Sequence, residues 1–236
     1  MIMSLIRQNL QAITATIVAA AQESGRPPEA VRLLAVSKTF GPEAVQEAVA
    51  AGQRAFGENY LQEGLDKIRA LNDAGAPALE WHFIGPIQSN KTRPIAENFA
   101  WVHTVEREKI AARLSEQRPA GLPPLQICLQ VNISGEASKS GVAPEEVAEL
   151  AHKVAALPNL TLRGLMAIPE PAVEFEQQRA AFARLRTLYE QLRAGGLALD
   201  TLSMGMSADM RAAIFEGATI VRVGSAIFGA RNYNKA

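Results

Sequence analysis

The sequence predicts a single α/β domain that forms a (β/α)₈ TIM barrel, with one extra helix at its N-terminal end. Strand-like segments alternate with helix-like segments, eight strands can be counted, and no linker or change of composition interrupts them. Such alternation is typical of a parallel sheet with helical crossovers. A barrel needs roughly 250 residues, so we expect one domain over residues 1–236. An open, doubly wound sheet is the alternative that the pattern permits.

The first segment is predicted to be an amphipathic helix and not a signal peptide. Ile6, Leu10, Ile13 and Ile17 recur at helical spacing, with polar residues between them. No uninterrupted apolar run reaches the length of a transmembrane helix. We therefore expect a cytoplasmic protein that does not bind membranes.

Each expected strand is a short, mostly apolar run, as parallel strands covered on both faces require. The first of them is nearly continuous in apolar residues. In chain order, the expected strands cover 31–37, 54–57, 79–85, 101–105, 125–132, 160–168, 202–204 and 219–227.

The helices that follow the strands carry recognisable start and stop signals. Pro42 and Glu43 open the helix after the first strand, where proline and an acid are favoured. Ser89 or Asn90 is placed to cap the helix after the third strand. The later helices are expected at 60–72, 91–98, up to 118, from 144, at 175–194 and at 209–216.

Composition excludes several classes of function. Lys plus Arg equals Asp plus Glu at 24 each, and no dense basic run is present, so no nucleic-acid partner is expected. The single cysteine, Cys128, lies in an apolar run and is expected to be buried; a catalytic thiol is the alternative. His82, His103 and His152 lack the spacing of a zinc site, so no metal is expected.

Polar residues gather at the C-terminal ends of the strands, where the active sites of such barrels lie. Lys38 directly follows the first strand. Partial desolvation there would lower the pKa of its amine and make the amine nucleophilic. A solvated lysine at a strand end is the alternative.

The last two strands end in loops suited to a phosphate group. Gly205 and Gly224 allow close approach of the backbone, while Ser203, Ser207 and Ser225 supply hydroxyl groups. Alone, such loops are often simple turns. Together with the lysine after the first strand, they predict a site for a phosphorylated aldehyde cofactor.

Arg222 lies two residues before Gly224, so both are expected on the same face of the last strand. A guanidinium inside a barrel needs an acceptor, and the pyridine nitrogen of such a cofactor is one. A glutamate within the barrel is the equally suitable alternative.

Several segments, in order along essentially the whole chain, resemble the YggS/PROSC family of pyridoxal phosphate homeostasis proteins. The resemblance implies that pyridoxal 5′-phosphate (PLP) is held as a Schiff base on Lys38. The segments are Ala35–Thr39, Phe56–Tyr60, Trp81–Gly85, Gln88–Lys91, Ser138–Gly141, Arg163–Met166, Leu202–Ser207 and Arg222–Gly229.

The same resemblance implies the other cofactor contacts. Arg222 would face the pyridine nitrogen, and Asn59 would lie beside the ring, near its phenolic oxygen. The residues on the phosphate side would be Ser203, Gly224 and Ser225, with Met204 and Gly205 adjoining them. No residue is expected to be catalytic.

Three positions extend or depart from the family pattern. Lys139 matches a lysine near the pocket that could take or hand on cofactor. Ser225 stands where threonine is commoner, which keeps the hydroxyl. Arg211 stands where an acid is usual, so a surface salt bridge is expected to differ.

The family barrel also resembles the N-terminal domain of bacterial alanine racemase, which keeps an enzyme in view. Racemisation needs two bases, and the Schiff-base lysine supplies only one. We expect no room for the second domain that carries the other base, although Tyr60 and Tyr233 remain conceivable. A monomeric PLP carrier that delivers cofactor to apo-enzymes is therefore the first hypothesis, and a PLP-dependent racemase or related amino-acid enzyme is the alternative. A sugar-phosphate enzyme is a third, disfavoured because Glu58 is the only acid clearly at a strand end.

Overall fold

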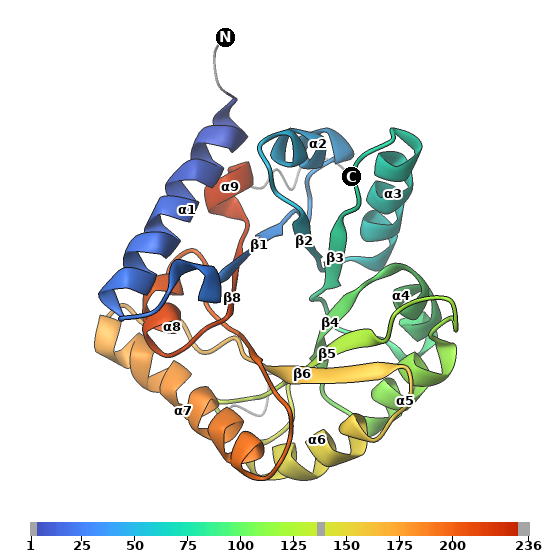
Figure 1. Cartoon of the computed structure of the whole chain (residues 1–236), viewed down its shortest axis with the longest axis vertical. Helices are drawn as coiled ribbons and strands as arrows, with labels where there is room; N and C mark the ends of the chain where they lie inside the picture. Colours follow the sequence, from blue (N-terminus) through green and yellow to red (C-terminus); the bar gives the residue numbers. More distant parts are fainter. Residues whose placement is uncertain (1–3, 136–139, 231–236) are drawn as a thin grey trace.

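The computed structural model describes residues 4–135 and 140–230. Within these residues, the parallel strands pair in chain order, and the last pairs with the first (Figure 1). The predicted barrel is therefore confirmed, and the open sheet is excluded. The strands are β1 (Arg32–Val36), β2 (Ala55–Glu58), β3 (Glu80–Phe83), β4 (Trp101–Val105), β5 (Leu125–Gln130), β6 (Leu160–Met166), β7 (Thr201–Ser203) and β8 (Ile220–Val223).

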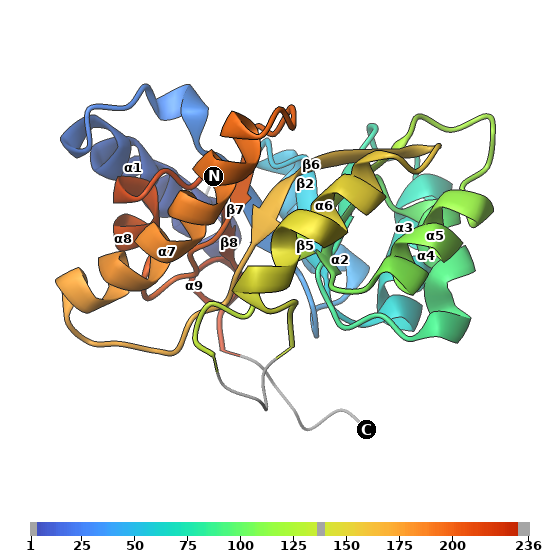
Figure 2. The same ribbon diagram turned by 90° about the horizontal axis from the view of Figure 1, so that it is seen from below.

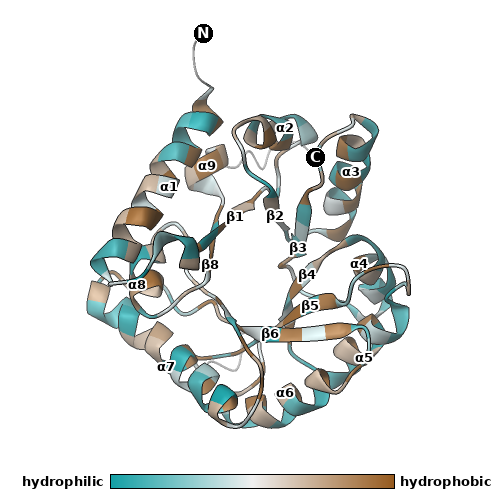
Figure 3. Ribbon diagram, viewed as in Figure 1, coloured by the Kyte–Doolittle hydropathy of each residue, from teal (hydrophilic) through white to brown (hydrophobic). Residues whose placement is uncertain are grey.

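The helices surround the barrel and turn their hydrophilic residues outward, whereas their apolar residues face the strands (Figure 3). This arrangement follows from their amphipathic sequences, because each apolar stripe is buried against the sheet. The helices are α1 (Leu5–Glu23), α2 (Pro42–Ala50), α3 (Leu61–Asp73), α4 (Thr92–Asn98), α5 (Glu108–Gln117), α6 (Val147–Ala155), α7 (Phe175–Ala194), α8 (Met210–Phe215) and α9 (Ser225–Phe228).

The core has two parts, one between barrel and helices and one inside the barrel. The outer part holds most of the buried apolar side chains. Cys128 belongs to the inner part, where burial raises the pKa of its thiol to about 12, so the group is protonated at neutral pH. The inner cluster comprises Leu34, Val36, Ala55, Ile84, Trp101, Cys128, Met166 and Ile220.

The extra N-terminal helix α1 packs beside α8 and α9 (Figures 1 and 2). Leu10 and Ile17 are buried on its inner face, in agreement with the predicted amphipathic helix. Arg211 of α8 pairs with Glu23 of α1 at 2.9 Å, so this surface ion pair links the extra helix to the barrel. None of the helices in residues 4–135 and 140–230 is long and apolar enough to cross a membrane.

The predicted end of the last strand and the predicted cap of α4 were wrong. The last strand ends at Val223, and the amides of Ile227 and Phe228 bond back to the carbonyl of Gly224, which closes the short helix α9. Ser89 and Asn90 do not cap α4 with their side chains, because they belong to a preceding 3₁₀ turn.

Candidate functional site at the C-terminal end of the barrel

The parallel sheet brings the predicted site residues to one end of the barrel. Strand β1 pairs with β2 on one side and β8 on the other. Lys38 follows β1, Asn59 follows β2, and Gly224 and Ser225 follow β8. Lys38 is half-buried and Ser225 is exposed. The lysine and the Gly-Ser turn therefore lie on neighbouring strand ends, as the sequence predicts.

Arg222 lies inside the barrel and is 4 % exposed. Its guanidinium donates to Ser203 Oγ at 2.9 Å and to the carbonyl of Ala167 at 3.0 Å. Burial lowers the pKa of Arg222 to about 10, which leaves it charged at neutral pH. The ion pairs formed within the described part of the chain do not include Arg222. The glutamate partner considered above is thus not what holds this arginine.

Ser203 ends β7, and Met204 and Gly205, which follow it, have different surroundings. Ser203 is fully buried inside the barrel, where it contacts Arg222. Met204 packs in the outer core, so its side chain faces the helices. Gly205 has a φ of 94°, and an added Cβ would lie 2.6 Å from that of Ala213, so only glycine fits here.

Asn59 presents a polar atom that needs a partner. Its Oδ1 is buried and makes no hydrogen bond with any residue that the structure describes. A buried acceptor of this kind is costly unless a ligand or water satisfies it. The Asn59 backbone is packed against Gly85, where a Cβ would lie 2.0 Å from the Asn59 carbonyl oxygen.

A buried ion network lies beneath the Lys38 turn. Lys67 of α3 is 3 % exposed and contacts Glu58 Oε1 at 2.7 Å and Glu63 Oε1 at 2.5 Å. It also donates to the carbonyl of Ser37 at 2.6 Å, and the Ser37 hydroxyl donates to Glu58. Burial raises the pKa of Glu58, against the opposing effect of the Lys67 charge. The network therefore holds the residue that precedes Lys38.

The same network holds the residue that follows Lys38. Thr39 has a φ of 70°, an uncommon conformation for a β-branched residue. Its backbone amide donates to Glu63 Oε1 at 2.6 Å. Backbone strain of this kind persists only where the surroundings enforce it, and it often marks a functional site.

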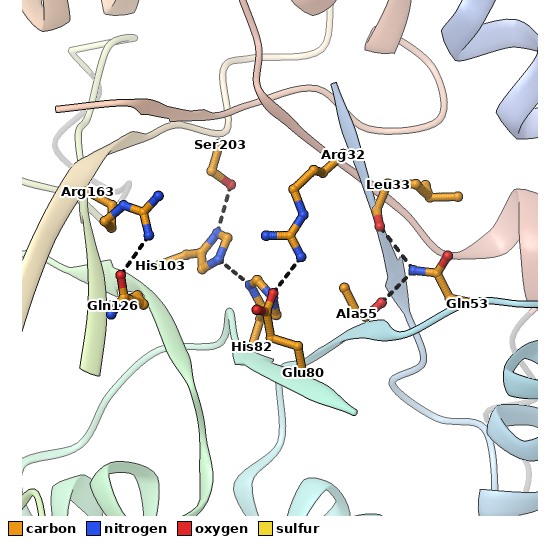
Figure 4. Close-up of polar contacts among 10 residues, drawn as sticks. All are labelled: Arg32, Leu33, Gln53, Ala55, Glu80, His82, His103, Gln126, Arg163 and Ser203. Atoms are coloured by element: carbon orange, nitrogen blue, oxygen red, sulfur yellow. Dashed lines mark hydrogen bonds and ion pairs between the residues drawn. The ribbon is translucent and has the colours of Figure 1, made fainter. Parts of the chain in front are cut away.

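A chain of polar contacts leads from the site through the barrel interior (Figure 4). His103 Nδ1 lies 2.8 Å from Ser203 Oγ, and His103 Nε2 lies 2.9 Å from His82 Nδ1. His82 Nε2 lies 2.7 Å from Glu80 Oε1, which also accepts from Arg32 at 2.7 Å. Glu80 begins β3, at the end of the barrel opposite to Lys38.

Burial lowers the pKa of His82 and, more strongly, that of His103, from an ordinary value of 6.5. As pH falls through about 6.5 the unfolded chain takes up a proton at each ring, whereas the folded chain takes them up only at lower pH. The free energy of unfolding should therefore decrease as the pH is lowered, by up to about 2.7 kcal/mol per pH unit for the two histidines together. Urea unfolding across this range measures the slope. In a His103→Asn variant the histidine contribution should fall to about half, and an unchanged slope would contradict the assignment.

Sequence reasoning missed both the ion network and the contact between the two histidines. The signals were present: Glu63 and Lys67 are spaced i,i+4 on one helix, and His82 and His103 sit inward on consecutive strands. Lys139 and Tyr233 lie outside the described residues. The described residues contain no group of three or more His, Cys, Asp or Glu side chains that could hold a metal ion.

Comparisons with known proteins agree over nearly the whole length. The sequence profile of the family described as "Alanine racemase, N-terminal domain" matches residues 8–232. The pyridoxal phosphate homeostasis protein of Pseudomonas aeruginosa is 65% identical over 231 residues, covering 98% of each chain. That of Vibrio cholerae is 59% identical over 234 residues, covering 99% of each chain.

Solved structures share the same fold. PipY of Synechococcus elongatus, solved with PLP bound, is 37% identical with a TM-score of 0.82, and the match covers 95% of this chain and 100% of PipY. Alanine racemase of Corynebacterium glutamicum matches with a TM-score of 0.67 at 21% identity, over 94% of this chain and 61% of that enzyme. The second match concerns the barrel alone.

Proposed function

Because this chain belongs to the family of pyridoxal phosphate homeostasis proteins, we propose that it binds PLP and buffers its supply to PLP-dependent enzymes. Two relatives at 59–65% identity carry that name, and PipY has been solved with PLP bound. Bound PLP supplies an aldehyde that captures amines and a ring that accepts electrons. The proposal includes a monomeric protein in the cytoplasm and delivery to apo-enzymes, as the family resemblance implies.

The observation that carries the proposal is the buried guanidinium of Arg222 on the strand next to Lys38. A buried cation that donates to a hydroxyl and to a carbonyl gains from a further acceptor, and a pyridine nitrogen fits that need. Lys38 would hold the aldehyde as a Schiff base, with loss of the aldehyde oxygen as water. Lys38 and Arg222 would thus hold opposite sides of one planar ring.

The phosphate group belongs at the ends of β7 and β8. Gly205 and Gly224 would allow the backbone to approach it, and the exposed Ser225 hydroxyl would donate to it. The Ser203 side chain points to Arg222, and the Met204 side chain packs in the outer core. Ser203 would therefore act on the cofactor through Arg222, and Met204 would contact it through the backbone.

Asn59 would stand beside the ring, where its unsatisfied Oδ1 fits the ligand's polar edge. The orientation of an Asn amide is assigned from its neighbours, so this side chain can offer either an acceptor or a donor to the phenolic oxygen. Its buried polar atom therefore suits the proposed ligand.

A carrier is favoured over a racemase by the electronics and by the position of Tyr189. A guanidinium cannot accept a proton, so Arg222 leaves the pyridine nitrogen unprotonated and the ring a weaker electron sink. Tyr189 donates to the carbonyl of Leu199 in the outer core, and Tyr60 is 55% exposed at the start of α3. Tyr189 is therefore not arranged as the second base.

The proposal is tested by adding PLP to the purified protein, reducing with borohydride and mapping the modified peptide. We expect one pyridoxyl group, on Lys38. A label spread over surface lysines, or none, would refute the site.

The carrier assignment needs a separate measurement. D- or L-alanine is added to the PLP-loaded protein in D₂O, and exchange of the α-proton is followed by NMR. We expect no exchange above that caused by free PLP; faster exchange would favour the enzyme.

A further inference from the structure

The polar chain, defined as Arg222, Ser203, His103, His82 and Glu80, crosses the barrel from the proposed PLP site to the opposite end. Figure 4 shows its part from Ser203 to Glu80. All of its members except Glu80 are less than 5% exposed. The three consecutive contacts from Ser203 to Glu80 measure 2.7–2.9 Å between their polar atoms. Flipping either ring would place carbon atoms at these distances, so the nitrogens occupy these positions.

Glu80 fixes which atom donates at each step of the polar chain. Partial burial acts to raise the pKa of Glu80, but the His82 contact and the charge of Arg32 outweigh it and lower the pKa to about 2. Glu80 is therefore a carboxylate at neutral pH and can only accept. His82 Nε2 must donate to it, which leaves His82 Nδ1 as an acceptor in the neutral ring.

The same reasoning continues toward the ligand site. His103 Nε2 must donate to His82 Nδ1, because that atom has no proton. His103 Nδ1 is then the acceptor, and the single hydroxyl proton of Ser203 is committed to it. Ser203 presents only lone pairs to Arg222, which donates to it. Every hydrogen bond of the polar chain consequently has its proton directed toward Glu80.

We propose that His82 and His103 are positioning residues for Arg222, which they hold by committing the Ser203 proton away from it. The Ser203 oxygen is thereby a permanent acceptor that fixes one arm of the guanidinium, and the Ala167 carbonyl fixes the other. The consequence for PLP rests on the proposed function: a fixed guanidinium keeps its geometry toward the pyridine nitrogen. Remote Glu80 thus influences the cofactor ring from the far end of the barrel.

The packing around the two histidines restrains the side chains of the polar chain. The His82 ring stacks on Trp101, with centroids 5.3 Å apart and planes 9° apart. On the same indole, the Arg163 guanidinium carbon lies 4.9 Å from the ring centroid. A stacked ring cannot rotate freely, so the donor and acceptor nitrogens of His82 keep their places.

The direction of the polar chain is observable without any ligand. Long-range ¹⁵N–¹H NMR of the full-length protein at neutral pH reports which nitrogen of each imidazole carries the proton. We expect neutral rings with the proton on Nε2 for both His82 and His103, assigned with His82→Gln and His103→Gln variants. A proton on Nδ1 of either ring, or a charged ring, would overturn the proposal.

The effect on the ligand site is tested with Glu80→Gln. The new amide can donate as well as accept. The hydrogen bonds of the polar chain then no longer have one fixed direction, although the side chains keep their shape. We expect a second His82 tautomer, a shifted absorption maximum of bound PLP, and PLP affinity reduced about threefold to tenfold. Glu97→Gln is the matched control, because Glu97 lines the same cavity of about 610 Å³ as Glu80 but lies outside the polar chain.

The outcomes separate this inference from the proposed function. A Glu80→Gln protein with the parent's PLP affinity and spectrum would refute the positioning role, as would an equal effect of Glu97→Gln. A His103→Phe variant, which keeps an aromatic ring, should reproduce the shifted spectrum. If the parent protein fails to bind PLP, the proposed function is refuted. The histidine tautomers still decide the direction of the hydrogen bonds in the polar chain.

Discussion

Replacing Lys38 with alanine is expected to weaken PLP binding on the order of a hundredfold, equivalent to about 2.7 kcal/mol. The covalent bond would be lost, while the contacts at Arg222 and the strand ends would still hold the ligand. The backbone is held on both sides of Lys38, by Lys67 at the Ser37 carbonyl and by Glu63 at the Thr39 amide, and such positioning makes capture efficient. Absorption spectra and equilibrium dialysis measure the change.

Two variants separate the chemistry from charge and from general damage. Lys38→Arg keeps the positive charge, but a guanidinium does not form a Schiff base with an aldehyde at neutral pH, so the Schiff-base absorption band should be absent. Lys109→Ala removes an exposed lysine from α5, on the outside of the barrel, and should bind PLP as the parent does. A Schiff-base band that survives in Lys38→Ala would show that another lysine captures the ligand.

The fold was predictable because its signals are local. Each strand is a short apolar run, and the helices carry caps and apolar stripes that need no knowledge of distant residues. The exact end of β8 was not predictable, because Ala226 to Phe228 are as apolar as a strand. The bonding of the Ile227 and Phe228 amides to the Gly224 carbonyl separates helix α9 from the sheet.

The candidate site was predictable in part, for the same reason. Lys38 and Gly224 follow strands, and all parallel strands of a barrel end on one side. The prediction for Ser203 was incomplete: as the last residue of β7 it points into the barrel, where it meets Arg222 and His103. Such contacts depend on which strands face one another across the barrel, which spacing within one segment does not encode.

Lys67 shows the same limit for charged residues. A lysine on a predicted helix is normally assigned to the solvent, and its Glu63 neighbour resembles a surface pair. The structure instead places Lys67 against the strand ends, 2.6 Å from the Ser37 carbonyl and 2.7 Å from Glu58. This buried position leads to the largest expected change of stability.

Replacing Lys67 with methionine is expected to lower the free energy of unfolding by about 3–5 kcal/mol, because it leaves a buried carboxylate unpaired. Glu58 is fully buried, and its second oxygen, Oε2, already has no hydrogen-bond partner among the described residues. The turn that carries Lys38 should loosen as well, since Lys67 bonds to the Ser37 carbonyl and to Glu63, which accepts from Thr39. Urea unfolding measures the stability, and PLP titration reports the turn.

A second substitution identifies the cause of that loss. Adding Glu58→Gln to Lys67→Met removes the unpaired charge and should recover a large part of the lost stability. In the single variant the pKa of Glu58 should rise further above its unfolded value, so its contribution to stability is present at low pH and is lost as pH rises through the folded pKa. The deficit of the variant should therefore shrink on acidification.

Lys153→Met removes a lysine that pairs with Glu149 and Glu108 on the surface and should change the stability little. Equal losses for the buried and the surface lysine would contradict the role assigned to the network.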